Sequence, residues 1–298
     1  MRLSLKIVGA LAVALSISPS FAEKPKAYTY LALGDSISFG FDPTKIKGGA
    51  LPKPHRFTGY PEIVAKYGKL EHVNASCPGE TSSSFVILSI PPRDTPDNGC
   101  NGRGPDNQEP FKTSIGLHAS YAGSQLEFAL AQIQANPQID LITISIGGND
   151  LSLLQKDCLT KSPQDFEGCV RAELPGVLGL YAKNLGRILG DIRAVPPAAS
   201  YKGRIVLLTN YSPDPAFDIA IIALNDTMKF VGNAFGATPA DGFEAFKLIS
   251  DRFAEGNACA AGLLVRLAPN VCDIHPSEDG QKLLAATILS TLEKDKKR

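Results

Sequence analysis

Ser36 and His275 are residue types that together can carry out nucleophilic acyl transfer. Ser36 follows the apolar run 30–33, and His275 lies near the C-terminus, directly before Pro276. A serine hydroxyl is a weak nucleophile until a base takes its proton. Histidine can accept that proton and return it, because its ordinary pKa is near neutral. The pair therefore predicts attack of the Ser36 oxygen on a carbonyl carbon, although Asp35 and Ser36 could also simply cap a helix.

An attacked carbonyl becomes an oxyanion, and Gly79 and Asn149 have the chemistry to stabilise one. Such a site needs donors fixed in advance, each contributing about 3 kcal/mol. We expect three donors: the backbone N–H groups of Ser36 and Gly79 and the side-chain amide of Asn149. Gly79 suits this role because a backbone without a Cβ can approach a substrate closely. Ordinary turn residues are the alternative for both positions, and we assign that structural role to Asp150.

Asp273 is the acid nearest to His275 in the sequence. In an extended backbone, residues two apart point the same way, with Cα atoms about 6.6 Å apart. The Asp273 carboxylate could therefore orient the imidazole. A backbone carbonyl could do so instead, which would leave a Ser–His dyad.

The candidate residues follow segments that have the pattern of buried strands. We predict strands at 29–33, 72–75, 141–146 and 205–209. The last two are nearly continuous apolar runs, which is typical of parallel strands covered on both faces. Ser36, Gly79 and Asn149 each follow one of the first three strands. Since ligands bind beyond the carboxyl ends of parallel strands, we expect these residues to converge at one sheet edge.

Helical patterns lie between and after the strands, at 59–67, 123–135, 177–192, 219–230 and 277–292. Pro175 is expected to mark the start of the third helix, and Ser277 to cap the last. Strand–helix repetition indicates an α/β fold with an open, doubly wound, mostly parallel sheet. Two long polar loops, 41–58 and 91–110, are either rims of the site or surface insertions.

Residues 1–22 have the pattern of a secretory signal peptide. Arg2 and Lys6 flank the start of an apolar run at 7–17, and Ser20-Phe21-Ala22 provides small residues before a cleavage point. A membrane anchor is the alternative, but the run is short for a bilayer span. We therefore expect a secreted or periplasmic protein without stable membrane insertion. Residues 23–298 are long enough to form a single α/β domain.

Charge and cysteine content restrict the classes of partner and cofactor. After cleavage the chain would hold 28 basic and 30 acidic residues, a net charge of −2. That balance provides no electrostatic footprint for nucleic acid. We expect no metal, because C-x-x-C and H-x₃-H spacings are absent from the sequence. We also expect no organic cofactor and a monomeric protein.

Six cysteines in an exported chain indicate disulfides. They allow 15 connectivities, and the sequence alone does not choose among them. Neighbours along the chain favour three local pairs, each contributing about 3 kcal/mol to stability. These pairs are Cys77 with Cys100, Cys158 with Cys169, and Cys259 with Cys272.

Together these segments resemble the motif blocks of the SGNH, or GDSL-type, hydrolases. The blocks are Gly34-Asp35-Ser36, Gly79, Gly147 to Asp150, and His275-Pro276, in the family's order over most of the chain. Ile37 replaces the usual leucine. The cysteines and Cys77-Pro-Gly-Glu-Thr81 resemble secreted, disulfide-containing bacterial members. The resemblance implies a flavodoxin-like three-layer α/β/α sandwich and hydrolysis of carboxylic esters or thioesters through Ser36 and His275.

One position departs from the family pattern. The usual last block is D-x-x-H, and position 272 is Cys, which leaves Asp273 as the available acid. The resemblance covers lipid or short-chain acyl esters and also carbohydrate O-acetyl esters. A non-catalytic sugar- or lipid-binding module is the alternative from another class. Exposed apolar loop residues would favour lipid acyl chains, and the candidates are Phe39, Phe41, Leu51 and Phe57. Packing of these side chains on the core is the alternative.

Overall fold

A five-stranded, wholly parallel sheet forms the centre of this computed structural model, in the order β2-β1-β3-β4-β5. The structure describes residues 29–46, 53–87, 96–102, 109–195 and 201–295. The proposed signal peptide and Leu51 lie outside these ranges. The strands are β1 (Tyr30–Gly34), β2 (His72–Asn74), β3 (Leu141–Ser145), β4 (Arg204–Leu208) and β5 (Thr238–Ala240). This strand order is the flavodoxin-like one, as expected, with its topological switch point between β1 and β3.

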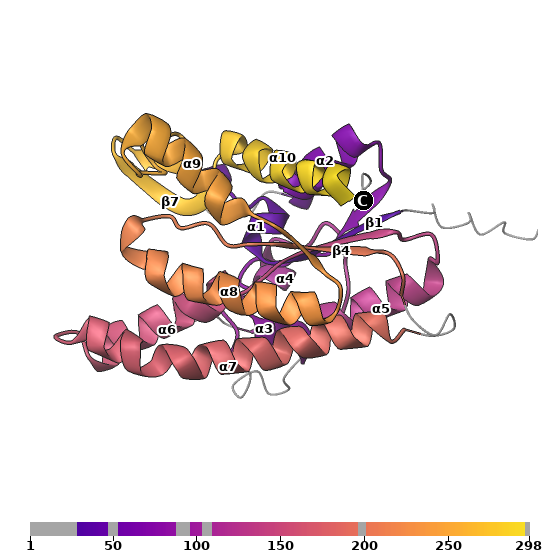
Figure 1. The fold of residues 1–298 in the computed structure, drawn as a ribbon, viewed down its shortest axis with the longest axis horizontal. Coiled ribbons are helices and arrows are strands. Elements are labelled where there is room, and N and C mark those ends of the chain that lie inside the picture. The colour runs from indigo at the N-terminus through magenta and orange to yellow at the C-terminus, as the bar shows by residue number, and fades with distance from the viewer. Residues whose placement is uncertain (1–28, 47–52, 88–95, 103–108, 196–200, 296–298) are drawn as a thin grey trace, which may run out of the picture.

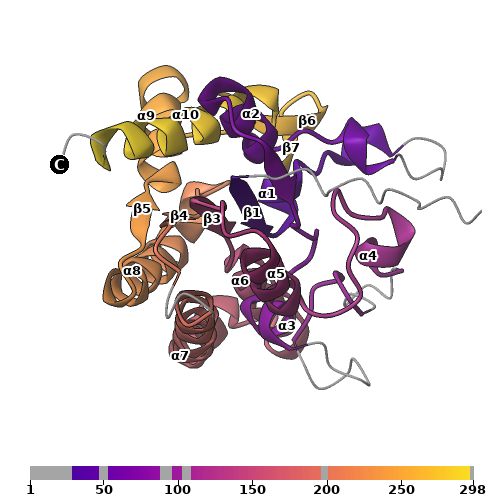
Figure 2. The ribbon, with the colours of Figure 1, turned by 90° about the vertical axis from the view of Figure 1, so that its right-hand side faces the viewer.

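Helices cover both faces of the sheet and complete an α/β/α sandwich (Figure 1, Figure 2). One layer contains α2 (Tyr60–Gly68), α9 (Gly242–Ala254) and α10 (Glu278–Asp295). The other contains α3 (Ser82–Val86), α5 (Gln125–Ala135), α6 (Gly148–Lys161), α7 (Phe166–Arg193) and α8 (Asp218–Ala234). Short elements complete the chain: α1 (Ser36–Phe39), α4 (Phe111–Ser114), and the 3₁₀ turns η1 (Pro43–Lys45), η2 (Pro54–Arg56) and η3 (Pro215–Phe217).

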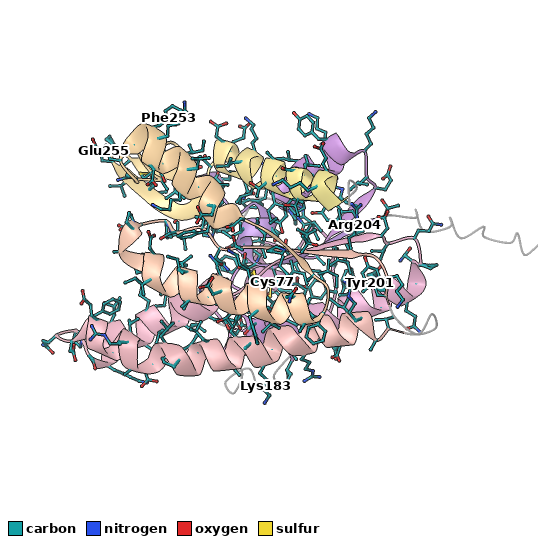
Figure 3. The ribbon with its side chains drawn as sticks, viewed as in Figure 1. Cys77, Lys183, Tyr201, Arg204, Phe253 and Glu255 are labelled. Atoms are coloured by element: carbon teal, nitrogen blue, oxygen red, sulfur yellow. A yellow bond between two sulfur atoms is a disulfide. The ribbon has the colours of Figure 1, made fainter. Side chains whose placement is uncertain are left out.

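Alternation along the strands divides the core between the two layers. In β1, Leu31 and Leu33 pack with the α5–α7–α8 layer, whereas Tyr30 and Ala32 pack with α2 and α10. Successive strand side chains point to opposite faces, so a continuously apolar strand contributes to both cores. Side chains labelled in Figure 3 show the contrast between inside and outside: Cys77 is central, whereas Lys183 and Glu255 lie at the periphery.

Several predicted boundaries were wrong for identifiable reasons. The helix expected to start at Pro175 begins at Phe166, with Pro175 inside it. Asp165 caps this helix by accepting from the Gly168 N–H at 3.1 Å, and Pro175 lies on the exposed side, where water can bond the freed carbonyl. The sequence analysis also missed α6, α9 and β5. β5 is a short edge strand, and Pro239 within it is exposed, as proline in a sheet requires.

An antiparallel hairpin outside the main sheet carries the last motif block. It consists of β6 (Leu264–Ala268) and β7 (Val271–Pro276). The structure confirms all three expected disulfides: Cys77–Cys100, Cys158–Cys169 and Cys259–Cys272. The last of these joins β7 to the segment between α9 and β6. Within the described residues, no helix combines the length and the hydrophobicity needed to cross a membrane.

Candidate active site

Ser36 begins the short helix α1, directly beyond the carboxyl end of β1. Asp35 is the N-cap of this helix, and its carboxylate accepts from the Ile37 N–H at 3.0 Å. Gly34 makes the turn at a φ of +136°, and a Cβ there would lie 2.1 Å from the Ser145 carbonyl oxygen. Only glycine fits that position. The cap that competed with the nucleophile interpretation is therefore present on Asp35, and it holds the Ser36 turn in shape.

His275 reaches Ser36 from β7, 239 residues along the chain. Its Nε2 lies 2.9 Å from Ser36 Oγ, so the hydroxyl can donate to the ring. The Phe41 ring packs against the imidazole, with 4.9 Å between centroids. The Tyr211 hydroxyl donates to the Ile274 carbonyl at 2.6 Å, which anchors the backbone of β7 next to His275. The Phe41 contact and this backbone anchor thus hold the imidazole next to the hydroxyl that it would deprotonate.

Asp273 lies on the same side of β7 as His275. Its Oδ1 contacts the imidazole Nδ1 and also accepts from the His275 backbone N–H at 3.0 Å. Partial burial opposes ionisation of this carboxyl, but the hydrogen bonds and charge of His275 hold its pKa below the ordinary value. Asp273 is therefore ionised near neutral pH. Ser36, His275 and Asp273 form a continuous nucleophile–base–acid arrangement, the geometry of a catalytic triad.

The loop after β2 brings Gly79 beside the Ser36 turn. The Cys77 N–H donates to the Gly34 carbonyl at 3.0 Å, which extends the pairing of β2 with β1. Gly79 has a φ of +79°, and a Cβ there would lie 2.5 Å from the Asn98 carbonyl oxygen. The Cys77–Cys100 disulfide joins the two segments that meet at this point. Gly79 does not itself line the pocket at Ser36.

Asn149 lies in the first turn of α6 and lines the same pocket as Ser36. Its Nδ2 donates to the Glu80 carbonyl at 2.9 Å, and its Oδ1 accepts from the Asn98 side chain at 2.7 Å. A primary amide has two N–H groups, and the Glu80 bond uses one. The orientation of the amide is thus set from both ends, as a preorganised donor requires.

Asp150, next in α6, has a structural position. Its carboxylate accepts from the Ser82 N–H at 2.9 Å and from the Ser82 hydroxyl at 2.6 Å. These bonds join α6 to α3. Burial raises the pKa of Asp150 to about 6, although the Ser82 hydrogen bonds oppose this rise.

A pocket of about 750 Å³ opens from Ser36 between the α6–α7 hairpin and the η3–α8 segment. Four apolar side chains of α7 line it at intervals of four residues: Phe166, Val170, Leu174 and Leu178. Residues four apart share one face of a helix. The sequence analysis missed this stripe of pocket-lining residues, although their regular four-residue spacing in the sequence could have indicated it.

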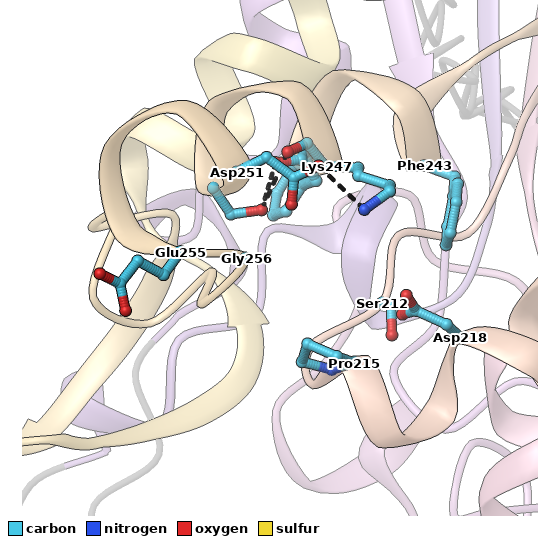
Figure 4. A pocket seen from close by; sticks show the side chains of 10 residues that line it. Ser212, Pro215, Asp218, Phe243, Lys247, Asp251, Glu255 and Gly256 are labelled. Atoms are coloured by element: carbon cyan, nitrogen blue, oxygen red, sulfur yellow. Dashed lines mark hydrogen bonds and ion pairs between the residues drawn. The ribbon is translucent and has the colours of Figure 1, made fainter.

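A second, smaller pocket lies apart from the candidate catalytic residues. It has a volume of about 210 Å³ and lies between η3 and α9, where Lys247 and Asp251 form an ion pair at 2.9 Å (Figure 4). None of the Ser36, His275 or Asp273 side chains lines it.

Within the described residues, one cluster has metal-like spacing, namely Cys77, Glu80 and Cys100. Both of its sulfurs are in a disulfide, so neither can be a thiolate ligand.

The apolar loop candidates for acyl-chain contact pack on the core, the alternative interpretation, wherever the structure describes them. Phe39, Phe41 and Phe57 are at most 8% exposed and belong to one core cluster beside the Cys77–Cys100 disulfide. They support the His275 ring and the α1 turn from inside the protein. The side chains that line the pocket come from α6, α7, η3 and α8 instead.

A family model for GDSL-like lipases and acylhydrolases matches residues 32–283, which include all four motif blocks. The chain belongs to this family. The resemblance inferred from the motif blocks is thereby confirmed, and the chain is a member of a group of esterases and lipases. None of the curated proteins compared with it matches.

Solved structures share the fold of this GDSL-family chain at low sequence identity. A phospholipase A1 from Streptomyces albidoflavus is 17% identical with a TM-score of 0.53, over 89% of this chain and 99% of that one. An extracellular lipase from Streptomyces rimosus is 18% identical with a TM-score of 0.53, over 88% and 98% of the two chains. A lipase from a goat rumen metagenome has 16% identity and a TM-score of 0.52, over 88% and 96%.

Proposed function

We propose that this protein is an exported carboxylic-ester hydrolase that acts through an acyl-Ser36 intermediate on esters of medium- or long-chain acids. The observation that carries the proposal is the 2.9 Å contact between Ser36 Oγ and His275 Nε2 at the mouth of an apolar pocket. Binding alone would not require a hydroxyl, an imidazole and a carboxylate in series. Three disulfides and the predicted signal peptide support export.

Acylation begins with attack of Ser36 Oγ on the ester carbonyl, while its proton passes to His275 Nε2. Asp273 holds the imidazole in the orientation that receives this proton and stabilises the charge that forms. The oxyanion accepts hydrogen bonds from the Ser36 N–H and the Asn149 amide, which line the pocket. The Gly79 N–H, in the adjoining loop after β2, is the third donor of the proposal. Collapse expels the alcohol, which takes the proton from His275.

Deacylation repeats these roles with water as the nucleophile. His275 takes a proton from the water, and the hydroxide attacks the acyl carbon. Collapse of the second tetrahedral intermediate releases the free acid and returns the proton to Ser36.

The α7 stripe supports an acyl chain of considerable length as the substrate. From Phe166 to Leu178 the stripe spans 12 residues, or about 18 Å at a rise of 1.5 Å per residue. A fully extended alkyl chain advances about 1.25 Å per carbon, from a carbon–carbon bond of about 1.5 Å. The stripe can therefore contact about 14 carbons.

The course of α6 and α7 supports a binding mode in which the near end of the stripe lies at Ser36. Asn149 opens α6 beside Ser36, and α6 then leads away to the Cys158–Cys169 disulfide. α7 returns from that end, so Phe166 is distant. Leu178 lies close to Tyr181, whose hydroxyl donates to the Ile146 carbonyl near Gly147. The carboxyl end of an acyl chain would thus contact Leu178, and its methyl end would approach Phe166.

Hydrolysis of a series of p-nitrophenyl esters, from acetate to palmitate, tests this function. We expect kcat/KM to rise from acetate to the medium- and long-chain esters, and Ser36→Ala to lose all turnover above background. A fluorophosphonate should label Ser36 in the wild type. Acetate as the best substrate would indicate the O-acetyl esterase alternative. Absence of both turnover and labelling would indicate a binding protein.

A further inference from the structure

Two fully buried polar residues, Glu80 and Gln125, lie behind the candidate site and have no role in the proposed reaction. Glu80 follows Gly79, and Gln125 is the first residue of α5. A buried carboxyl and a buried amide are costly to keep unless their hydrogen bonds are satisfied. Their partners therefore show what this pair holds together.

Gln125 bonds both backbone groups of Gly34, the residue that turns β1 into the Ser36 helix. Its Oε1 accepts from the Gly34 N–H, and its Nε2 donates to the Gly34 carbonyl at 2.9 Å. The amide thus bonds this glycine as a neighbouring strand would. The position of the turn two residues before Ser36 depends on this side chain.

Glu80 connects Gln125 to the candidate oxyanion donors. Its carboxyl Oε2 accepts from the same Gln125 Nε2 at 2.9 Å. Its backbone carbonyl accepts from Asn149 Nδ2 at 2.9 Å, and its backbone directly continues from Gly79. Gly34, Gln125, Glu80 and Asn149 therefore form one hydrogen-bonded series across β1, α5, the β2 loop and α6.

We propose that Glu80 is a positioning residue that, through Gln125 and Asn149, sets the Ser36 nucleophile relative to its oxyanion donors. The proposal rests on the function proposed above. Glu80 does not touch the reacting atoms, so its effect passes through the groups that it holds. An error of about 1 Å between a nucleophile and its donors can cost about 100-fold in rate.

The surroundings of Glu80 favour its neutral form. Burial raises the pKa of the Glu80 carboxyl to about 8. Hydrogen bonds from Ser84 and Gln125 and the charge of Lys112 oppose this rise, whereas the charge of Asp97 adds to it. The charge of Glu80 in turn helps to raise the pKa of Tyr121, after burial as the main cause, and the Tyr121 hydroxyl donates to the Ala75 carbonyl at 3.0 Å.

The protonation state has a kinetic consequence. At neutral pH the carboxyl is mostly uncharged, and the oxyanion forms beside a neutral group. As the pH rises through about 8, ionisation of Glu80 adds a negative charge behind the oxyanion donors. That charge disfavours the transition state, so kcat should fall on the alkaline side.

The test compares Glu80→Gln, Glu80→Ala and Gln125→Ala with the wild type. Each is assayed for kcat and KM on p-nitrophenyl octanoate from pH 6 to 10, and for the rate of fluorophosphonate labelling of Ser36. Circular dichroism and thermal unfolding identify any variant that fails to fold. Glu127→Gln is the matched control, because Glu127 is an exposed acid in the first turn of α5 that caps the helix.

Glu80→Ala and Gln125→Ala should lower kcat and the labelling rate at least 10-fold, with KM changed less than threefold. Glu80→Gln preserves the shape and can bond both neighbours, so it should keep kcat within threefold at pH 7. It should also lose the alkaline fall that the wild type shows. The control should match the wild type throughout.

The proposal is overturned if folded Glu80→Ala keeps wild-type kcat, or if Glu80→Gln is as impaired as Glu80→Ala. An unchanged alkaline limb in Glu80→Gln would also overturn it. If the wild type labels but hydrolyses no ester, the proposed function fails and the labelling rates still decide the role of Glu80. If the wild type neither labels nor hydrolyses, both fail, because a positioned nucleophile is common to them.

Discussion

Replacement of Asp273 by alanine tests the least regular part of the site. The carboxylate makes one bond to the imidazole Nδ1 and one to the His275 backbone N–H. A hydrogen bond to a charged group contributes about 1.5–3 kcal/mol. The Asp273 side chain is only 25% exposed, so water screens its bond to the imidazole little, and that bond should contribute about 2–3 kcal/mol. At 1.36 kcal/mol per factor of ten, its loss predicts a fall in kcat of about 30- to 160-fold.

The assay is steady-state hydrolysis of p-nitrophenyl octanoate, with thermal unfolding as a check on the fold. KM should change little, because Asp273 acts on the base and not on the bound ester. Asp273→Asn keeps the shape and removes the charge, so it should lose nearly as much activity. Asp279→Ala is the control, since this acid is exposed in the first turn of α10.

The reasoning would be refuted if Asp273→Ala kept more than a third of wild-type kcat. The imidazole would then be oriented by a backbone carbonyl, and the machinery would be a Ser–His dyad. A large rise in KM with unchanged kcat would also contradict it, because that pattern indicates lost binding of the ester.

Three further perturbations test other parts of the site. Val170→Trp should block the stripe about 12 Å from Leu178. It should therefore lower kcat/KM for the palmitate ester at least 10-fold relative to the octanoate ester. The control Ala172→Trp, on an exposed face of the same helix, should leave this ratio unchanged. The double substitution Cys259→Ser with Cys272→Ser should lower the free energy of unfolding by about 3 kcal/mol and should lower kcat at least fivefold. The double substitution Cys158→Ser with Cys169→Ser, which breaks the α6–α7 disulfide, should also lower stability but should leave kcat for p-nitrophenyl acetate unchanged. Burial raises the pKa of Asp150 to about 6, above its unfolded value of about 3.9, so the Asp150 contribution to the free energy of unfolding should fall by about 2 kcal/mol from pH 4 to 6 in urea titrations. The wild type should therefore lose more stability over this range than Asp150→Asn, and equal slopes would refute this.

Local sequence patterns determined the layered architecture. Continuous apolar runs indicated the parallel strands, and β1, β3 and β4 lie within a residue of the predicted ends. The boundaries that failed depend on tertiary contacts. α7 begins nine residues before Pro175 because a cap and a disulfide hold its first turns, and β5 forms because an edge position tolerates its proline.

The chemistry divides in the same way. The sequence by itself determined which residue types could act, since Ser36 and His275 are recognisable from their blocks, and it left the acid and the acyl group open. The i, i+2 spacing already suggested that Asp273 and His275 share one side of an extended segment, but the tertiary structure alone brings that side against Ser36. It also buries Phe41 and Phe57 and assigns the pocket to α7. Contacts between residues more than two hundred positions apart depend on the packing of the whole sheet, which no local pattern records.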